Sequence, residues 1–254
     1  MSSKATANRI LAMNTVAFTA CFMVWTMYGV LITWLVDNRV LELDKAQMGW
    51  LIGIPILSGS VVRLPVGLMT DRYGGKPVYI GVMLFSALSL YVTSYATTYW
   101  QLLVAGLFFG VAGSSFAVGI AYSSMWYPKE KQGTALGVFG MGNAGAALTT
   151  LFAPRLIKAF TDGATDIERW RLLPKLYAVI LIAVTIVFAL TTVNKKVEGA
   201  AQRSMWDMLR PLNDVRVWRF GLYYFLVFGA FVALAQWLVP YYLNVYGMSL
   251  ATAG

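Results

Sequence analysis

The sequence has no histidine and a single cysteine, Cys21, among its 254 residues. One cysteine excludes a disulfide within the chain, and without histidine the usual cysteine–histidine zinc clusters are excluded as well. Charged residues make up only 12% of the chain, whereas a soluble domain usually has about 25%. We therefore predict no metal site and no cofactor, and we expect a chain that is poorly suited to water.

The chain is unusually rich in apolar residues, since hydrophobic residues make up 59% of it. A helix needs about 20 apolar residues to cross a hydrocarbon core of ~30 Å. Seven stretches of this length are almost free of charge. We predict an all-α membrane protein with spans at Ile10–Val36, Met48–Met69, Val78–Tyr95, Leu102–Tyr127, Thr134–Pro154, Leu176–Val193 and Phe220–Tyr246.

The basic residues predict how the chain is oriented in the membrane. If the N-terminus is cytoplasmic, twelve of the 20 lysines and arginines lie on the cytoplasmic side, seven lie on the opposite side, and one lies within a span. The positive-inside rule favours this arrangement. Topology and anionic lipid thus account for the net charge of +9, and we expect no nucleic-acid partner. We predict a multi-pass protein of the cell (inner) membrane with a cytoplasmic N-terminus.

The basic residue within a span is Arg63, in LIGIPILSGSVVRLPVGLMT. It lies about seven residues, or ~10 Å of helix rise, from the cytoplasmic end of the second stretch. No aspartate or glutamate occurs in any of the seven stretches, and a charge at this depth costs at least about 2.5–3.5 kcal/mol. A bound anion could supply the counter-charge, because guanidinium binds planar oxyanions through two hydrogen bonds. The alternative is an arginine that snorkels to the inner headgroups.

A glycine-rich loop, GLMTDRYGGKP at residues 67–77, follows the second stretch. Glycines permit a tight turn and close helix contact, and charged side chains can pair across a junction that opens and closes. The segment resembles the G-x-L-x-D-R-x-G-G/R-K/R signature between the second and third helices of major facilitator superfamily transporters. The resemblance implies a conformational role for Gly67, Asp71, Arg72, Gly74 and Lys76.

That resemblance implies twelve helices in two six-helix halves, with a substrate site near the membrane midplane between them. The chain then divides into an N-terminal six-helix bundle (residues 1–193), a cytoplasmic linker (194–219) and the first helix of a truncated C-terminal bundle (220–254). The linker contains an amphipathic stretch, SMWDMLRPLNDVRVW, suited to the inner membrane face. We expect transport to need the missing C-terminal half.

The fifth stretch contains a run of glycines around one asparagine, GTALGVFGMGNAGAALTTLFAP at residues 133–154. In lipid, glycine lets helix backbones approach closely. We predict that helix packing uses these positions, the first three of them along one face with Ala144: Gly133, Gly137, Gly140, Gly142 and Gly145. The side chain of Asn143 can make four hydrogen bonds, and leaving them unmade in hydrocarbon is costly. Asn143 could therefore contact the substrate or form a hydrogen bond to another helix, and the sequence leaves both alternatives open.

Three segments resemble the nitrate/nitrite porters of the NarK type. Residues 125–154 are similar to their signature segment, residues 107–124 to their fourth helix, and residues 59–75 to the branch described as proton-coupled nitrate importers. The resemblance implies that Arg63 grips the anion, Phe116 stacks on its face, Asn143 lies beside it, and Tyr224 reaches it. For Phe116, ordinary packing is the alternative. The family's second arginine and second stacking phenylalanine are expected beyond residue 254.

The implied function is secondary active transport of nitrate or nitrite by alternating access. Entry of an anion against a negative-inside potential costs about 2.3 kcal/mol per 100 mV, so uptake needs coupling. The resemblance favours nitrate/proton symport, although no stretch holds an acid or histidine to carry the proton; nitrate/nitrite antiport and transport of another small organic anion are alternatives. An enzyme would need clustered acid–base or metal-binding residues at membrane depth, and none is expected.

Overall fold

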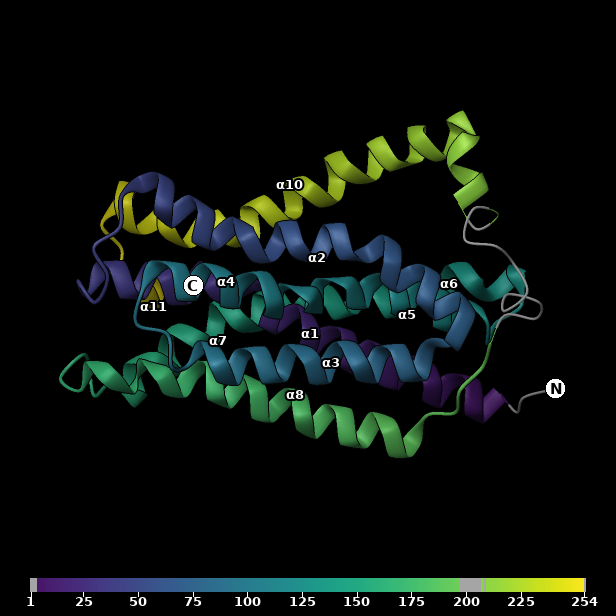
Figure 1. The fold of residues 1–254 in the computed structure, drawn as a ribbon, viewed down its shortest axis with the longest axis horizontal. Helices are drawn as coiled ribbons and strands as arrows, with labels where there is room; N and C mark the ends of the chain where they lie inside the picture. Colours follow the sequence, from purple (N-terminus) through teal and green to yellow (C-terminus); the bar gives the residue numbers. More distant parts are fainter. Residues whose placement is uncertain (1–3, 197–206, 208, 254) are drawn as a thin grey trace.

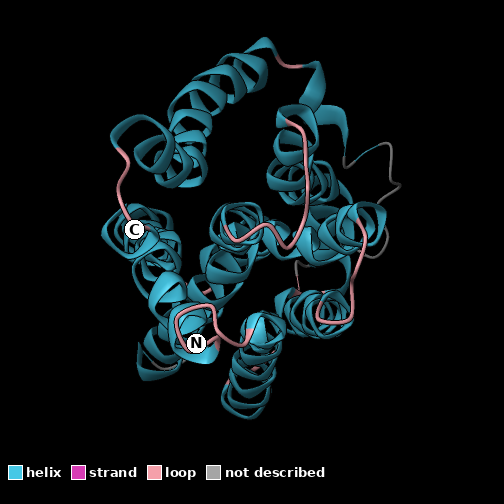
Figure 2. Ribbon diagram, turned by 90° about the vertical axis from the view of Figure 1, so that its left-hand side faces the viewer, coloured by secondary structure: helices cyan, strands magenta, loops and turns pink. Residues whose placement is uncertain are grey.

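The computed structural model describes residues 4–196, 207 and 209–253 and contains helices and no strands over these residues. Seven helical segments are long and apolar enough to cross a membrane, so the seven predicted spans are confirmed, with ends that differ by up to nine residues. They are Lys4–Asp37, Lys45–Tyr73, Gly75–Thr93, Tyr99–Ser124, Lys129–Phe160, Ile167–Thr191 and Val215–Tyr246. The helices run alongside one another in an elongated bundle (Figure 1), which Figure 2 shows from one end.

Four of the spans are continuous α-helices, and three are joined to or interrupted by 3₁₀ turns. The first three spans are α1 (Lys4–Asp37), α2 (Lys45–Tyr73) and α3 (Gly75–Thr93). The fourth comprises α4 (Tyr99–Phe109), η1 (Gly110–Ser114) and α5 (Ser115–Ser124). The fifth comprises α6 (Lys129–Gly140), η2 (Met141–Asn143) and α7 (Ala144–Phe160). The sixth is η3 (Ile167–Arg171) with α8 (Leu172–Thr191); η5 (Arg210–Asn213), α10 (Val215–Tyr246) and α11 (Leu250–Ala253) follow.

Local sequence explains where several of these helices begin. Asp44 accepts a hydrogen bond from the backbone N–H of Gln47, whose side chain accepts one from the backbone N–H of Asp44. Thr98 and Gln101 form the same reciprocal cap at the start of α4. Such capping boxes satisfy amides that the first helical turn leaves unpaired. Gly74, between α2 and α3, has φ +91°, a conformation that glycine adopts without strain, so this glycine makes the predicted tight turn.

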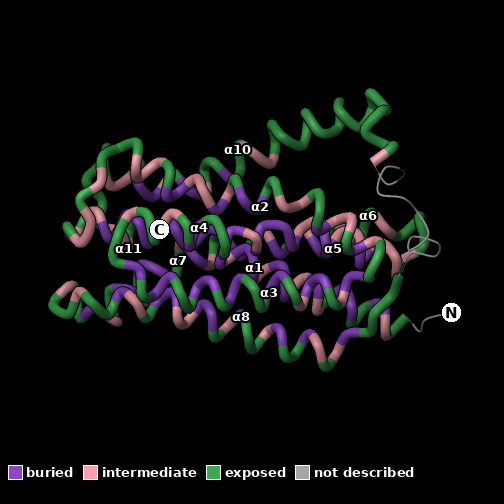
Figure 3. The backbone as a smooth tube through the Cα atoms, viewed as in Figure 1, coloured by how far each residue is buried: buried purple, intermediate pink, exposed green. Residues whose placement is uncertain are grey.

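The core of the bundle is built around α1, which is buried along most of its length and contacts α2, α7, α8 and α10 (Figure 3). The seventh span differs, because only four residues of α10 are buried and all lie in its second half: Val232, Gln236, Val239 and Pro240. Toward its N-terminal end α10 diverges from the bundle (Figure 1), and this part is largely exposed. The second half of α10 is thus packed on the bundle, and residues 215–223 at its start are exposed.

The helix of the seventh span begins five residues before the start predicted for it at the end of the linker. α10 begins at Val215, because Asp214 caps it by accepting a hydrogen bond from the backbone N–H of Arg216 at 2.9 Å. Residues 215–219 therefore belong to the helix. Of the predicted amphipathic stretch, residues 204–206 and 208 lie outside the described residues, and the described remainder forms η5 and the exposed first turn of α10.

The glycines of the fifth span do not share one packed face. A Cβ at Gly145 would lie 2.9 Å from the backbone nitrogen of Met23, and one at Gly142 would overlap the ring of Phe18, so these two glycines pack on α1. A Cβ at Gly133, Gly137 or Gly140 would meet no described atom within 4 Å. The 3₁₀ turn η2 separates the two groups, and its three residues per turn rotate the face that an uninterrupted α-helix would present. Gly67 is likewise open, with no described atom within 4 Å of its Cβ position.

Candidate functional site

Arg63 on α2 lies inside the bundle and not at a helix end. Its Nε donates to the backbone oxygen of Gly113 at 3.2 Å, and its Nη2 is buried with no hydrogen-bond partner. Among the described residues no carboxylate pairs with it, and the ionisable group that acts on it is Tyr224. The side chain therefore does not snorkel to the headgroups, and one edge of its guanidinium keeps an unused donor.

Three aromatic rings surround the guanidinium. Its Cζ lies 5.5 Å from the ring centroid of Trp25, 5.5 Å from that of Phe116 and 5.2 Å from that of Phe228. A cation at this distance from a ring face is stabilised by the ring quadrupole, by about 2 kcal/mol or more when desolvated. We call Arg63 with these three rings and Tyr224 the Arg63 cluster. The rings partly offset the cost of burying the cation but cannot neutralise it.

Glycines and one hydrogen bond from Trp25 determine where the side chains of the Arg63 cluster lie. The indole Nε1 of Trp25 donates to the backbone oxygen of Pro55 at 2.7 Å, which joins α1 to α2 next to Arg63. A Cβ at Gly113 or Gly59 would overlap this indole. The fourth span tightens into η1 at this point, and Phe116 follows in the first turn of α5. The glycines therefore let α1, α2 and the fourth span meet closely enough to set the indole beside the guanidinium.

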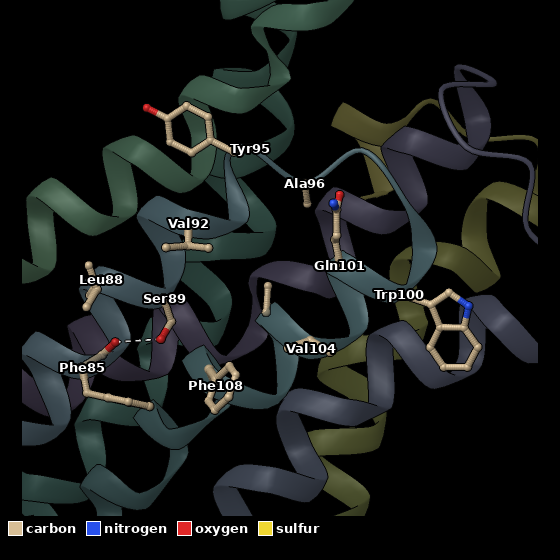
Figure 4. Close-up of a pocket in the computed structure, with 11 residues that line it drawn as sticks. Phe85, Leu88, Ser89, Val92, Tyr95, Ala96, Trp100, Gln101, Val104 and Phe108 are labelled. Carbon is tan, nitrogen blue, oxygen red and sulfur yellow. Dashed lines mark hydrogen bonds between the residues drawn. The ribbon is translucent and has the colours of Figure 1, made fainter.

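The cluster opens into a cavity of about 600 Å³ between α2 and α10. Most of its wall is apolar, and its polar side chains are Ser60, Arg63, Tyr224 and Gln236. A mainly apolar cavity with a few polar groups is typical of a small-molecule site. A second cavity of about 670 Å³ lies between α3 and α4 (Figure 4), but none of its 11 lining residues is charged. Of these two cavities, the one between α2 and α10 is therefore the one that fits an anion.

The structure brings together three of the four predicted substrate residues. Phe116 and Tyr224 stack with centroids 5.8 Å apart and planes at 22°, and both adjoin Arg63. Asn143 is not joined to them by any hydrogen bond or ring contact among the described residues. Its amide nitrogen donates to the backbone oxygen of Gly140 at 2.9 Å, within its own span, and its Oδ1 is buried without a partner.

Trp25 and Phe228 are members of the cluster that sequence reasoning missed. Phe228 lies four residues after Tyr224, which puts the two on one helix face, and their rings stack at 4.9 Å; this spacing was the available signal. A second stacking phenylalanine was expected only beyond residue 254, yet Phe228 stacks with Phe116 at 5.7 Å. A planar ion between two rings needs about 3.5 Å on each side, or ~7 Å in all. Phe116 and Phe228 must therefore separate before an ion can lie between them.

The loop predicted to act in conformational change holds the end of the sixth span. Lys76 Nζ donates to the backbone oxygen of Thr192 at 2.7 Å, and the amide of Asn194 donates to that of Tyr73 at 3.0 Å. The guanidinium of Arg72 lies 5.8 Å from the ring of Tyr73. In this conformation the Lys76 side chain thus binds a backbone carbonyl after α8, which ties the α2–α3 turn to the start of the linker.

Known transport proteins are similar to this chain over nearly its whole length. The chain is 43% identical to the "probable nitrate/nitrite antiporter NarK1" of Thermus thermophilus, which covers 96% of this chain and 56% of that protein. It is 30% identical to the "nitrite extrusion protein" of Bacillus subtilis, covering 96% and 59%, and 34% identical to a "probable nitrate/nitrite transporter NarK2" of Mycobacterium tuberculosis, covering 92% and 58%. The chain thus spans somewhat more than half the length of these curated relatives, which are named as transporters and not as enzymes.

The fold has a solved counterpart. A bacterial homolog of the human lysosomal transporter Spinster, in an inward-facing and unoccupied conformation, superposes with a TM-score of 0.75 at 19% identity, over 99% of this chain and 58% of that one. At this identity the likeness shows the fold alone. The sequence profile described as Major Facilitator Superfamily matches residues 15–254. With its seven membrane-length helices and this match over nearly its whole length, the chain belongs to the major facilitator superfamily of multi-pass membrane transporters.

Proposed function

We propose that this chain takes part in secondary active transport of nitrate or nitrite, with the Arg63 cluster as the anion site. The observation that carries the proposal is the guanidinium of Arg63, which has a buried unpaired donor and no carboxylate partner among the described residues. Nitrate and nitrite are flat oxyanions that can accept two hydrogen bonds from one guanidinium. The names of the relatives point to the same substrates.

The cluster suggests how the anion is selected and how it changes the protein. Phe116 and Phe228 lie nearly parallel, with an interplanar angle of 22°, and two parallel rings admit a flat ion more readily than a tetrahedral one. Because these rings must separate to admit it, binding is linked to movement of α10, whose first turns (residues 215–223) are exposed. A ligand that binds one conformation better than another shifts the balance between them. This is the basis of alternating access in the proposal.

The rest of the transporter is part of the proposal. We propose that residues 1–193 form a six-helix half with a cytoplasmic N-terminus in the cell membrane, that residues 194–219 include the cytoplasmic linker, and that α10 begins a second half needed for transport. The loop with Gly67, Asp71, Arg72, Gly74 and Lys76 would then act as the conformational junction. Asn143, with its unpaired Oδ1, would reach the anion in another conformation.

Nitrate/proton symport is our first proposal for the coupling, and nitrate/nitrite exchange is the second, favoured by the antiporter name of one relative. Proteoliposomes containing the twelve-helix protein separate them. In symport, external nitrate enters empty vesicles and acidifies the lumen, which a trapped pH dye reports. In exchange, nitrate enters only when the lumen holds nitrite. Absence of uptake under both conditions, in vesicles shown to contain folded protein, would contradict the transport function itself.

Phe228→Leu is expected to weaken nitrate binding by about 3- to 10-fold. The change removes one of the two rings that flank the anion position, and an aromatic contact of this kind contributes about 0.5–1.5 kcal/mol beyond its area. Nitrate titration of tryptophan fluorescence measures the affinity. Phe220→Leu is the matched control, because Phe220 lies on the same helix, is exposed, and is not among the residues that line the α2–α10 cavity. Equal losses in the two variants would remove Phe228 from the site.

A further inference from the structure

Gln236 on α10 has a buried amide that no protein group satisfies. The residue is only 2% exposed, and neither its Oε1 nor its Nε2 has a hydrogen-bond partner. A buried amide without partners is unfavourable in an apolar environment, and more so at membrane depth, where water is scarce. The side chain therefore has both a donor and an acceptor available to a ligand.

Gln236 is one of the residues that line the cavity containing the Arg63 cluster, and its amide atoms are closed off from that cavity in this conformation. Tyr224, Phe228, Val232 and Gln236 follow one another at intervals of four residues, and all four line the α2–α10 cavity. Twelve residues of helix rise separate Tyr224 from Gln236 by about 18 Å. The cavity thus has one polar end at Arg63, where α10 leaves the bundle, and another at Gln236, where α10 packs on it.

Gly29 on α1 makes the close approach at Gln236 possible. A Cβ at Gly29 would overlap Oε1 of Gln236 and lie 3.3 Å from its backbone oxygen. The contact of α1 with α10 therefore closes the cavity at the Gln236 end in this conformation. A movement that opened the Gln236 end of the cavity would expose the amide of Gln236 to a ligand that enters the cavity.

We propose that Gln236 is a second anion-binding position, about 18 Å of helix rise from Tyr224 of the Arg63 cluster, on the route of the ion through the α2–α10 cavity. The inference rests on the proposed function in that it takes nitrate as the ion. The amide nitrogen of Gln236 donates to the oxyanion, and since the amide is uncharged, the ion is held more weakly than at Arg63. Weak binding at this position is compatible with a transport route, because an ion that binds there can also dissociate.

Two tryptophans report the two positions separately. Trp25 adjoins Arg63, and Trp237 follows Gln236 and lines the same cavity. The 254-residue chain, labelled with 5-fluorotryptophan in detergent micelles, contains nine tryptophans, and Trp25→Phe and Trp237→Phe identify the two fluorine resonances of interest. Sodium nitrate is then titrated against each variant, with sodium gluconate holding the ionic strength constant. Both resonances are expected to shift, that of Trp237 at higher nitrate concentration.

Gln236→Leu is expected to abolish the nitrate-dependent shift at Trp237 and to leave the midpoint at Trp25 within about twofold. Gln236→Met should have the same effect. Its side chain is unbranched and similar in length to glutamine, so this variant keeps the test valid if Gln236→Leu fails to fold. Asn244→Leu is the matched control, because this amide on the same helix already donates to the backbone oxygen of Pro240 at 2.7 Å; both shifts should persist.

The outcomes separate this inference from the proposed anion site. A Trp237 shift that survives in both Gln236 variants, or is absent from the unmodified chain while Trp25 responds, overturns the second position and leaves the Arg63 site standing. A Trp237 shift that Gln236→Leu removes, with no response at Trp25, supports the second position and contradicts the first. If neither resonance responds, both proposals fail.

Discussion

Nitrate binding is expected to fall by about 10- to 100-fold in Arg63→Lys, although the charge is kept. Lysine presents a single ammonium where arginine presents a planar fork of donors, so one of two charge-assisted hydrogen bonds is lost. Such a bond contributes about 1.5–3 kcal/mol, and each 1.4 kcal/mol is a factor of about ten in affinity. Arg63→Gln, which also removes the charge, should bind nitrate more weakly still.

Affinity can be followed by nitrate titration of tryptophan fluorescence, since Trp25 lies 5.5 Å from the Arg63 guanidinium carbon. Arg219→Lys is the matched control, because Arg219 is an exposed arginine in the first turns of α10, before the cluster residue Tyr224, and this variant should bind nitrate as the unmodified chain does. If Arg63→Lys also binds like the unmodified chain, the paired hydrogen bonds are not what holds the anion, and the role proposed for the guanidinium is wrong.

Gly110→Ala is expected to destabilise the bundle by about 1–3 kcal/mol or more, the usual cost of overpacking a close contact. A Cβ at Gly110 would lie 2.6 Å from both Cα and the backbone oxygen of Pro55. Backbone atoms cannot rotate out of the way, so α2 and the fourth span must move apart. That movement would also displace Gly113, whose oxygen holds Arg63, and nitrate binding should weaken with it.

The free energy of unfolding of Gly110→Ala can be measured by denaturation in mixed micelles with tryptophan fluorescence as the signal. Gly81→Ala supplies the comparison, because Gly81 lies within α3 and a Cβ there would meet no described atom within 4 Å. In the control the higher helix propensity of alanine is the main change. Similar stability of the two variants would show that α2 and the fourth span are not in the close contact that the structure describes.

Much of the fold could be predicted because it depends on energies that belong to single segments. A stretch of some 20 apolar residues is driven into the bilayer, and once there it must be helical to satisfy its backbone. All seven spans were found in this way. The proposal that Arg63 binds an anion could be made from the sequence for the same reason, since an unpaired charge among apolar residues is costly whatever its neighbours are.

Composition and spacing thus determined that the chain is a helical membrane protein with a buried guanidinium in need of a partner. Tertiary structure decided which side chains meet it: Trp25 and Phe228 adjoin Arg63, whereas Asn143 bonds within its own span. It also decided that Gly142 and Gly145 pack on α1 while Gly133, Gly137 and Gly140 stay open. The reason is physical: insertion into a membrane is a property of each segment, whereas a contact between helices depends on the rotation and position of both partners, which a 3₁₀ turn or a close glycine contact can change.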